Sequence, residues 1–342
     1  MKIKILIAAT SIFLFACLSL TPPAEDSTAP VEATLPPPVD AAPQDTASAP
    51  EQTIGDGPTI ANCPMFPANN VWNTPIDSLP IHPMSDAWVE SIGSAEPIHM
   101  DFGSGVWDGG IIGIPYNIVA GSATPKFEAE FYYPEESDAG PYPIPDNPNI
   151  EYGSDHHILV VDTETCTLYE IFDASFDGTN WKGGGGAIWD LNSNALRPDE
   201  WTSADAAGLP ILPGLTRYDE VLAGEIKHAL RFTAEQTAGY LWPGRHLTAD
   251  PDDSIPPLGA RFRLKADYDI SGFPPEMQVI LQALKTYGMF LADNGSNWYV
   301  SGAPDERWDN DMLHLLDVLT GSDFEVVDAS GMIVDVDSGE AK

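Results

Sequence analysis

The chain has 342 residues, and its 52 acidic residues against 15 Lys and Arg residues give a formal net charge of -37 at pH 7. A surface this negative repels nucleic-acid phosphates and anionic lipid headgroups, so nucleic-acid binding is excluded as a function. From residue 59 onward the sequence has no second linker and no internal repeat, and it is long enough to bury a substantial core.

The first 17 residues have the features of an export signal. Lys2 and Lys4 precede an apolar run at 5–16, which at about 12 residues is too short to span a bilayer and is typical of a secretory signal peptide. The segment Leu-Phe-Ala-Cys at 14–17 resembles a bacterial lipobox, which implies cleavage before Cys17 and lipidation of its thiol. The alternative is an ordinary signal peptide cut nearby. We therefore expect an extracytoplasmic protein, either an outer-membrane or cell-surface lipoprotein touching the membrane through its N-terminal lipid only, or a secreted protein.

Residues 18–58 predict a spacer, and residues 59–342 predict a single β-rich extracytoplasmic domain. The spacer is dominated by Pro, Ala, Thr, Ser and acidic residues and contains no Lys or Arg. It cannot bury enough apolar surface to offset its ordering entropy, so we expect it to be disordered and extended. If Cys17 carries the lipid, Cys63 and Cys166 remain as a pair in an oxidising compartment, which favours a disulfide.

The first strong pattern of secondary structure is a β-hairpin in the middle of the chain. Before it, only short strands are predicted, at about 110–114 and 127–133. Residues 156–161 and 167–172 are rich in β-branched and aromatic residues, and 162–166 supplies the turn.

The expected register of this hairpin brings two chemical groups together. If Asp162 faces Thr167 across the turn, His157 and Glu170 become diagonal neighbours on one face of the sheet. A slip of one residue would change all of these neighbours. A histidine beside a carboxylate can act as an acid/base couple or supply two metal ligands.

The second half of the chain predicts further strands and two helices. The strands are expected at 225–233, 238–242, 260–266, 289–293, 296–300, 324–327 and 332–336. Asn294 and Gly295 predict a type I′ hairpin turn between the fourth and fifth of these strands. The helices are expected at about 276–287 and 309–319, where apolar residues recur at helical spacing. Because short strands outnumber helices, we expect a mainly β fold, a β-sandwich or jelly-roll-like domain with two helices in its C-terminal half.

Several of the few basic residues lie in this second half. Arg261, Arg263 and Lys265 alternate with apolar residues in one predicted strand, which indicates one buried face and one basic face. Arg231 and Arg245 precede that strand. Together these residues predict a basic groove for an anionic ligand such as a uronic-acid polymer. The alternative is that they pair with the abundant surface acids.

Two more histidines extend the set of candidate groups. His228 falls in a predicted strand, and His246 follows Arg245. Several histidines and one carboxylate inside a curved sheet would suit a metal ion, by analogy with known metal sites. The alternative is that each histidine has a structural role.

A tryptophan–acid pair, Trp189 and Asp190, opens a long polar loop that begins near Asn192. Such a loop builds either a binding surface or a structural flap. Indole rings stack on the apolar faces of sugars, although tryptophans also fill protein cores. Glycoside hydrolysis needs two carboxyl groups about 5 Å or about 6.5–9.5 Å apart. Glu170, Asp173 and Asp190 are the best candidates for that pair.

The sequence thus predicts a cell-surface carbohydrate-active enzyme, either a glycoside hydrolase or a uronate lyase acting on a polysaccharide. The expected catalytic residues are His157, Glu170 and Asp190, and the expected substrate-binding residues are Trp189, Asn192, His228, Arg231, Arg245 and His246. Two alternatives stay open: a non-catalytic carbohydrate-binding or adhesion lipoprotein, and a metal-dependent enzyme with a His/Glu site. The expected partner is a polysaccharide or other glycan; no metal ligand is assigned, and the sequence identifies no cofactor.

Overall fold

We describe the chain from a computed structural model, which covers residues 57–342 in describable detail. The predicted signal peptide at 1–17, and the predicted spacer up to residue 56, lie outside the described residues. Within residues 57–342, no helix is both long enough and apolar enough to cross a membrane.

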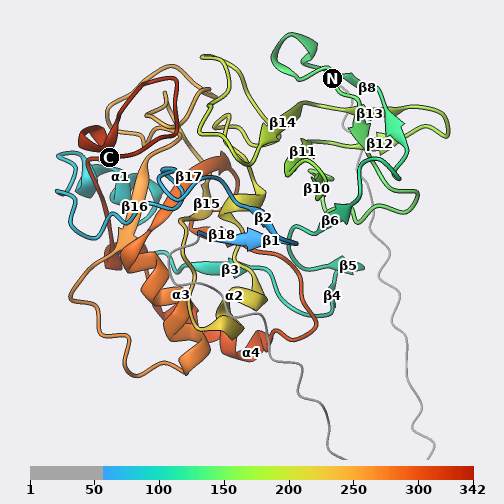
Figure 1. Ribbon diagram of the computed structural model, residues 1–342. Helices are drawn as coiled ribbons and strands as arrows, with labels where there is room; N and C mark the ends of the chain where they lie inside the picture. Colours follow the sequence, from blue (N-terminus) through green and yellow to red (C-terminus); the bar gives the residue numbers. More distant parts are fainter. Residues whose placement is uncertain (1–56) are drawn as a thin grey trace, which may run out of the picture. The chain divides into compact units, whose positions relative to one another are not determined.

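The described chain is mainly β, as predicted, and its short strands belong to several sheets (Figure 1). The strands of the first half are β1 (Thr59–Ile60), β2 (Cys63–Pro64), β3 (His99–Asp101), β4 (Val106–Trp107), β5 (Gly110–Ile111), β6 (Tyr116–Val119), β7 (Lys126–Phe127), β8 (Ala129–Phe131), β9 (Tyr142–Pro143), β10 (Ile158–Asp162) and β11 (Thr167–Ile171). The later strands are β12 (Ser175–Phe176), β13 (Trp181–Gly183), β14 (Gly186–Asp190), β15 (Leu230–Ala234), β16 (Arg261–Leu264), β17 (Met289–Asn294), β18 (Tyr299–Ser301) and β19 (Phe324–Val326). The helices are α1 (Ser85–Ile92), α2 (Tyr218–Ala223), α3 (Pro275–Thr286) and α4 (Asn310–Leu313), with 3-10 turns η1 (Pro134–Glu136), η2 (Leu212–Gly214), η3 (His314–Val318), η4 (Gly321–Asp323) and η5 (Ser330–Met332).

The largest sheet has six strands in the order β19-β16-β17-β15-β18-β3. It is mixed, because β15 pairs with β17 in parallel and β18 pairs with β3 in parallel, whereas the other pairs are antiparallel. Phe232, Phe262 and Trp298 pack against one another in its core, with ring centroids 5.0–5.7 Å apart. Burial of these large rings makes this sheet the main apolar body of the domain.

The predicted hairpin turn at Asn294 and Gly295 is wrong. The chain does reverse there, but β17 and β18 are not hydrogen-bonded neighbours, because β15 lies between them. Gly295 runs so close to β15 that a Cβ atom at this position would lie 2.8 Å from Oγ1 of Thr233. The Asn-Gly pair therefore carries the chain over the end of an intervening strand, and only a glycine fits that approach.

The predicted central hairpin is confirmed, including its register. β10 pairs with β11 so that Asp162 faces Thr167 and Leu159 faces Glu170. β10 also pairs in parallel with β6, and β11 pairs with β14, which gives a four-stranded sheet in the order β14-β11-β10-β6.

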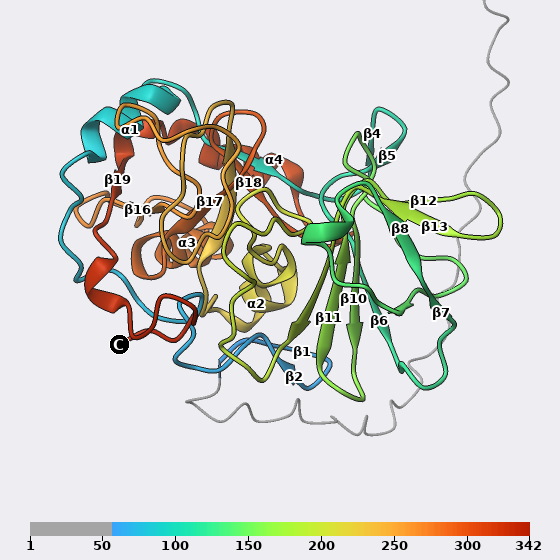
Figure 2. The same ribbon diagram turned by 90° about the horizontal axis from the view of Figure 1, so that it is seen from above.

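This four-stranded sheet lies between the six-stranded sheet and the three-stranded sheet β12-β13-β8 (Figure 2). Its two faces enter different cores. Leu159 and Val161 pack in the main core with Phe232, whereas Ile158 and Val160 pack in a second cluster. All five residues of β10 are buried as a result.

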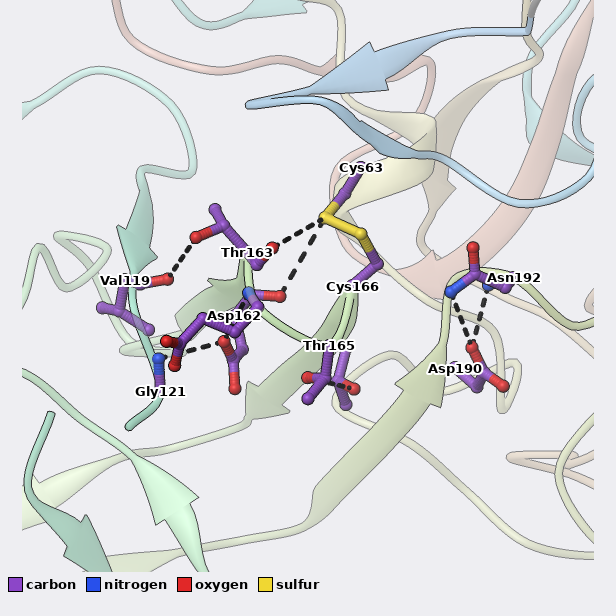
Figure 3. The surroundings of a disulfide bond; sticks show 11 residues. Cys63, Val119, Gly121, Asp162, Thr163, Thr165, Cys166, Asp190 and Asn192 are labelled. Carbon is purple, nitrogen blue, oxygen red and sulfur yellow. Dashed lines mark hydrogen bonds between the residues drawn. A yellow bond between two sulfur atoms is a disulfide. The ribbon is translucent and has the colours of Figure 1, made fainter. Parts of the chain in front are cut away.

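The predicted disulfide is present between Cys63 and Cys166, with Cα atoms 5.2 Å apart (Figure 3). It ties β2, near the start of the domain, to the β10–β11 turn. Side-chain hydrogen bonds fix the same turn: Gly121 donates its backbone N–H to Asp162 at 3.0 Å, and the Thr163 hydroxyl donates to the Val119 carbonyl at 3.0 Å.

Of the two predicted helices, the first is confirmed as α3, whose buried face is the predicted apolar stripe. The second, predicted at 309–319, is one α-helical turn followed by the 3-10 turn η3. Its buried residues are Leu313, Leu316 and Leu319. They recur every three residues, which is the period of a 3-10 helix and not of an α-helix.

Three of the later predicted strands are corrected. The strand predicted at 225–233 begins only at Leu230, because residues 225–229 form a loop, in which Ala229 donates its backbone N–H to the carbonyl oxygen of Trp72. Residues 238–242 form no strand, and Tyr240 makes only an isolated bridge to Leu258. Residues 332–336 form no strand either, because this segment follows the 3-10 turn η5.

Candidate functional site

A cavity of about 230 Å³ opens at the end of the four-stranded sheet where β11 ends and β14 begins. It is lined by Tyr133, Asp155, Phe172, Gly185, Thr202, Ser203, Ala204, Asp205, Ala206, Asp293 and Asn294. Three of these are acids, two are aromatic, and most of the rest come from the polar loop after Asn192. The polar loop therefore forms part of the cavity wall. We refer to this cavity as the acidic pocket.

A buried ion pair forms the base of the acidic pocket. The guanidinium of Arg231, on β15, donates from Nε and Nη2 to the two carboxylate oxygens of Asp205 at 2.9 and 2.6 Å. Its Nη1 donates to the hydroxyl of Ser301 at 2.5 Å. The side chains of Arg231 and Asp205 are 4% and 0% exposed. A bidentate pair this well buried fixes the orientation of Asp205.

Asp293, at the end of β17, is the second acid of the pocket. Its Oδ2 lies 3.9 Å from Nη2 of Arg231, the same nitrogen that donates to Asp205. Burial raises the pKa of Asp293 well above its usual value, and the negative charge of Asp205 raises it further. About a fifth (21%) of the Asp293 side chain nevertheless remains exposed. Burial and the neighbouring charge both favour the neutral carboxyl of Asp293, which is the form that can donate a proton to a ligand.

His157 lies behind the acidic pocket and not in its lining. Its Nδ1 is 2.5 Å from a carboxylate oxygen of Glu151, and its Nε2 is 3.0 Å from the carbonyl oxygen of Ala204. Burial alone would lower the pKa of His157, but the charge and hydrogen bond of Glu151 outweigh burial and raise the pKa to about 9. The protonated ring donates at both nitrogens, and it anchors the loop that carries Asp205.

Glu170 is also absent from the pocket lining. Its carboxylate accepts the backbone N–H groups of Ile211 at 3.0 and 3.1 Å and of Leu212 at 2.9 Å. The residue is 0% exposed, and burial raises its pKa to about 7 against the lowering effect of these two donors. Glu170 and His157 are neighbours as predicted, but neither presents an atom to an open cleft. Both position the backbone of the polar loop.

The remaining predicted catalytic residue, Asp190, is exposed at the end of β14. Its carboxylate accepts the backbone N–H of Asn192 at 2.9 Å and the side-chain amide of Asn192 at 3.3 Å (Figure 3). Trp189 is buried at 4% exposure, and its ring packs edge-on against Phe66. These residues open the polar loop, and none of the three lines the acidic pocket.

His228, Arg245 and His246 also lie outside the pocket lining. His228 is fully buried, with Nε2 3.0 Å from a carboxylate oxygen of Glu220. Arg245 donates to three acceptors, which are the carbonyl oxygens of Arg197 and Val336 and the carboxylate of Asp337. His246 has Nδ1 3.0 Å from the carbonyl oxygen of Ala206, the last pocket residue of the polar loop.

The alternative metal site, built from His157, Glu170, His228 and His246, does not form. Within residues 57–342, the one group of three ligands close enough to share an ion contains none of these four residues. Each of the four is instead held by its own local partners, described above.

The predicted basic groove is also wrong. Arg261 and Arg263 are 2% and 7% exposed, because β16 is buried on both faces. Arg261 donates to the carbonyl oxygens of Tyr287 and Val71, at 2.7 and 2.9 Å. Arg263 donates to Glu325 and to the carbonyl oxygen of Ile76. Both guanidiniums therefore hold loops to the sheet and are closed to a ligand.

The three acids of the pocket, Asp155, Asp205 and Asp293, were not among the predicted site residues. Asp293 follows the apolar run 289–292 at the end of a strand, which is a common position for a functional acid. No signal in the sequence pairs Asp293 with Asp205. The two acids come together only because β15, which pairs with β17, carries the Arg231 that binds Asp205.

The whole chain was compared with models of protein families, with curated proteins and with solved structures, and none of them matches. The acidic pocket is therefore the main basis for a functional proposal.

Proposed function

We propose that this protein is an extracytoplasmic hydrolase that acts on a terminal neutral sugar of a glycan, with the acidic pocket as its active site. The observation that carries the proposal is the Asp205–Asp293 pair. One carboxylate is fixed by Arg231, and its neighbour Asp293 has a raised pKa and an exposed edge in the cavity. A carboxyl whose surroundings favour the protonated form is suited to protonate a leaving-group oxygen.

Asp155 supplies the second reactive carboxyl in this proposal. It is the third acid of the pocket and is exposed. Asp205 cannot serve in that role, because both of its oxygens are bound by Arg231. Glycoside hydrolases separate the acid from the nucleophile or base by about 5 Å or by about 6.5–9.5 Å. Asp155 comes from a different segment of the lining than Asp205 and Asp293, and we propose that it meets this requirement.

The size and lining of the pocket support a single sugar ring as its ligand. Its volume of about 230 Å³ is below the roughly 300–1,000 Å³ typical of pockets for drug-sized ligands. Tyr133 is 57% exposed and, with Phe172, offers an aromatic surface beside the acids. Aromatic faces and hydrogen-bonding side chains together suit a ring with one apolar face and several hydroxyls.

The charge of the pocket favours a neutral substrate over a uronate. Its ionisable lining residues are the acids Asp155, Asp205 and Asp293. The lining contains no basic residue that could pair with a uronate carboxylate. Arg231 and Arg245, the expected partners of a uronate, are already bonded to Asp205 and Asp337. The glycoside hydrolase therefore has more support than the uronate lyase.

Two finer predictions remain part of this proposal. The N-terminal sequence supports a cell-surface or outer-membrane lipoprotein, or a secreted protein. A β-sandwich or jelly-roll-like arrangement of the sheets also remains a proposal, although the six-, four- and three-stranded sheets each contain at least one parallel pair.

A non-catalytic carbohydrate-binding or adhesion protein is the second candidate. It is favoured by exposed aromatic side chains outside the lining of the acidic pocket, such as Trp107 at 78% and Tyr132 at 63% exposure. Such a protein would bind a glycan on an open aromatic surface and leave it intact.

The test is hydrolysis of a panel of neutral oligosaccharides and aryl glycosides by the full described domain. We expect Asp293→Asn and Asp155→Asn each to lower kcat by at least about 100-fold, the usual contribution of a positioned acid or base. Asp146→Asn is the matched control, because Asp146 is an exposed acid outside the pocket. Binding without cleavage by the wild type would support the second candidate and overturn the hydrolase.

A further inference from the structure

Two imidazoles and one carboxylate meet on the surface of the domain, away from the acidic pocket. His99 lies on β3, whereas His314 and Asp317 lie on the 3-10 turn η3. One ligand atom from each residue lies within 4.8 Å of the other two, and within residues 57–342 this is the one group of three with that property. β3 is the edge strand of the six-stranded sheet, so the group joins that edge to a separate segment.

The distances within the group suit ligands that share an ion. Nδ1 of His99 lies 3.9 Å from Oδ1 of Asp317, and Nδ1 of His314 lies 3.0 Å from Oδ2 of Asp317. Tetrahedral ligands with zinc bonds of about 2.0–2.2 Å lie about 3.3–3.6 Å from one another. The two observed distances bracket that range. The longer one exceeds the reach of a hydrogen bond, so His99 and Asp317 face each other without bonding directly.

The second observation is an unsatisfied oxygen. Oδ1 of Asp317 is shielded from solvent and has no hydrogen-bond partner. A buried carboxylate oxygen without a partner costs roughly 1–3 kcal/mol, and more if it is charged. In native structures such a group has a specific cause, and one such cause is an ion that binds there. Here the unpaired oxygen faces the imidazole of His99, which is held by packing against the Tyr299 ring at 4.5 Å.

We propose that His99, His314 and Asp317 form a binding site for a divalent transition-metal ion, with Zn²⁺ as its best occupant. Two imidazole nitrogens and one carboxylate oxygen are a ligand set that zinc accepts, whereas Ca²⁺ and Mg²⁺ prefer oxygen ligands alone. The three side chains are 34%, 60% and 38% exposed, so an ion reaches them directly and a water molecule or an outside ligand completes its coordination.

Zinc at this site would pin β3 to η3. An edge strand is hydrogen-bonded on one side only, and η3 is a 3-10 turn with Leu315 and Val318 exposed at 44% and 65%. This inference does not depend on the function proposed for the acidic pocket.

The test is calorimetric titration of the tag-free domain with Zn²⁺ after treatment with a chelator. We expect one zinc ion per chain. Loss of an outer partner of a metal ligand typically costs about 10–100-fold in affinity, so His314→Ala and Asp317→Asn, which remove ligands themselves, should each weaken binding by more than about 100-fold.

His156→Asn is the matched control. His156 is an exposed histidine 3.8 Å from Asp173, so it has the same pairing but no second imidazole. Its backbone has φ 46°, a conformation that asparagine tolerates. The control should bind zinc as the wild type does. Failure of the wild type to bind zinc at 100 μM (about 100 times a micromolar Kd), or full binding by both ligand variants, would overturn the proposal. Circular dichroism of each variant separates loss of ligand from loss of fold.

Discussion

Asp205 and Asp293 both face the same nitrogen of Arg231, with Oδ1 of Asp205 2.6 Å and Oδ2 of Asp293 3.9 Å from its Nη2. Arg231 binds Asp205 with two hydrogen bonds but stays 3.9 Å from Asp293, so the two acids are not equivalent. Burial and the charge of Asp205 raise the pKa of Asp293, so Asp293 is the acid of this pair that favours its protonated form.

Removal of Arg231 tests the buried ion pair. We expect Arg231→Met to lower the free energy of unfolding by about 3–5 kcal/mol, because Asp205 is then buried without a partner. The double variant Arg231→Met/Asp205→Leu should recover much of that loss, since it removes both charges. Urea denaturation measures both values. A loss below about 1 kcal/mol for the single variant would show that Asp205 finds another partner or is protonated without penalty.

The His157–Glu151 pair predicts a loss of stability at alkaline pH. In the folded protein the pKa of His157 is about 9, whereas an ordinary histidine side chain has a pKa of 6.5. The stability that this shift contributes is complete below pH 6.5 and disappears as the pH rises through 9, with a size of about 3 kcal/mol. His157→Gln should lack this part of the pH dependence. Denaturation curves of the two proteins between pH 6 and pH 10 should therefore converge, and parallel curves would contradict the assignment.

Glu170 predicts a pH effect at lower pH. In the folded protein the pKa of Glu170 is about 7, whereas an ordinary glutamate side chain has a pKa of 4.5. The folded state therefore binds this proton more tightly than the unfolded state does. The contribution to stability is present below pH 4.5 and is lost as the pH rises to 7, by up to about 3 kcal/mol.

Glu170→Gln removes that pH dependence. The new side chain has one oxygen fewer to accept the backbone N–H groups of Ile211 and Leu212, which costs about 1–3 kcal/mol. We therefore expect the difference in unfolding free energy between wild type and Glu170→Gln to shrink from pH 4.5 to pH 7. Thermal or urea unfolding at several pH values measures the difference, and a constant difference would argue that Glu170 is ionised throughout.

We expect the disulfide to stabilise the fold strongly in oxidising conditions and not in reducing buffer. Cys63 and Cys166 are separated by 103 residues in sequence, and a loop of about 100 residues corresponds to about 4–5 kcal/mol in the chain-entropy model. The variant with both cysteines replaced by alanine should lose about 2–5 kcal/mol in urea denaturation. The wild type in reducing buffer should behave like that variant. Equal midpoints for oxidised wild type and the variant would show that the bond adds nothing.

Local features of the fold were predictable from the sequence. The β10–β11 register follows from the turn between Asp162 and Thr167, and the α3 stripe follows from helical spacing. The cysteine pair followed from counting. Each of these depends on residues that are close in sequence or few in number, so few arrangements compete.

The position of the acidic pocket was not predictable, because its acids come from a loop and from the end of β17. These segments meet only because β15 lies between β17 and β18, contrary to the local hairpin signal of Asn294 and Gly295. Burial of His157 and Glu170 had a signal, since the unbroken apolar run 158–161 is typical of a strand covered on both faces. The prediction instead assumed that the face of the hairpin with His157 and Glu170 is open.

The most direct test of the central claim is a titration of the aspartate carboxyl carbons by NMR, with Asp293 assigned through Asp293→Asn. The account predicts that the pKa of Asp293 lies well above 3.8 in the wild type and falls in Asp205→Asn, where the neighbouring charge is gone. A wild-type Asp293 that titrates near 3.8, or a value unchanged by Asp205→Asn, would contradict the acid role of this residue.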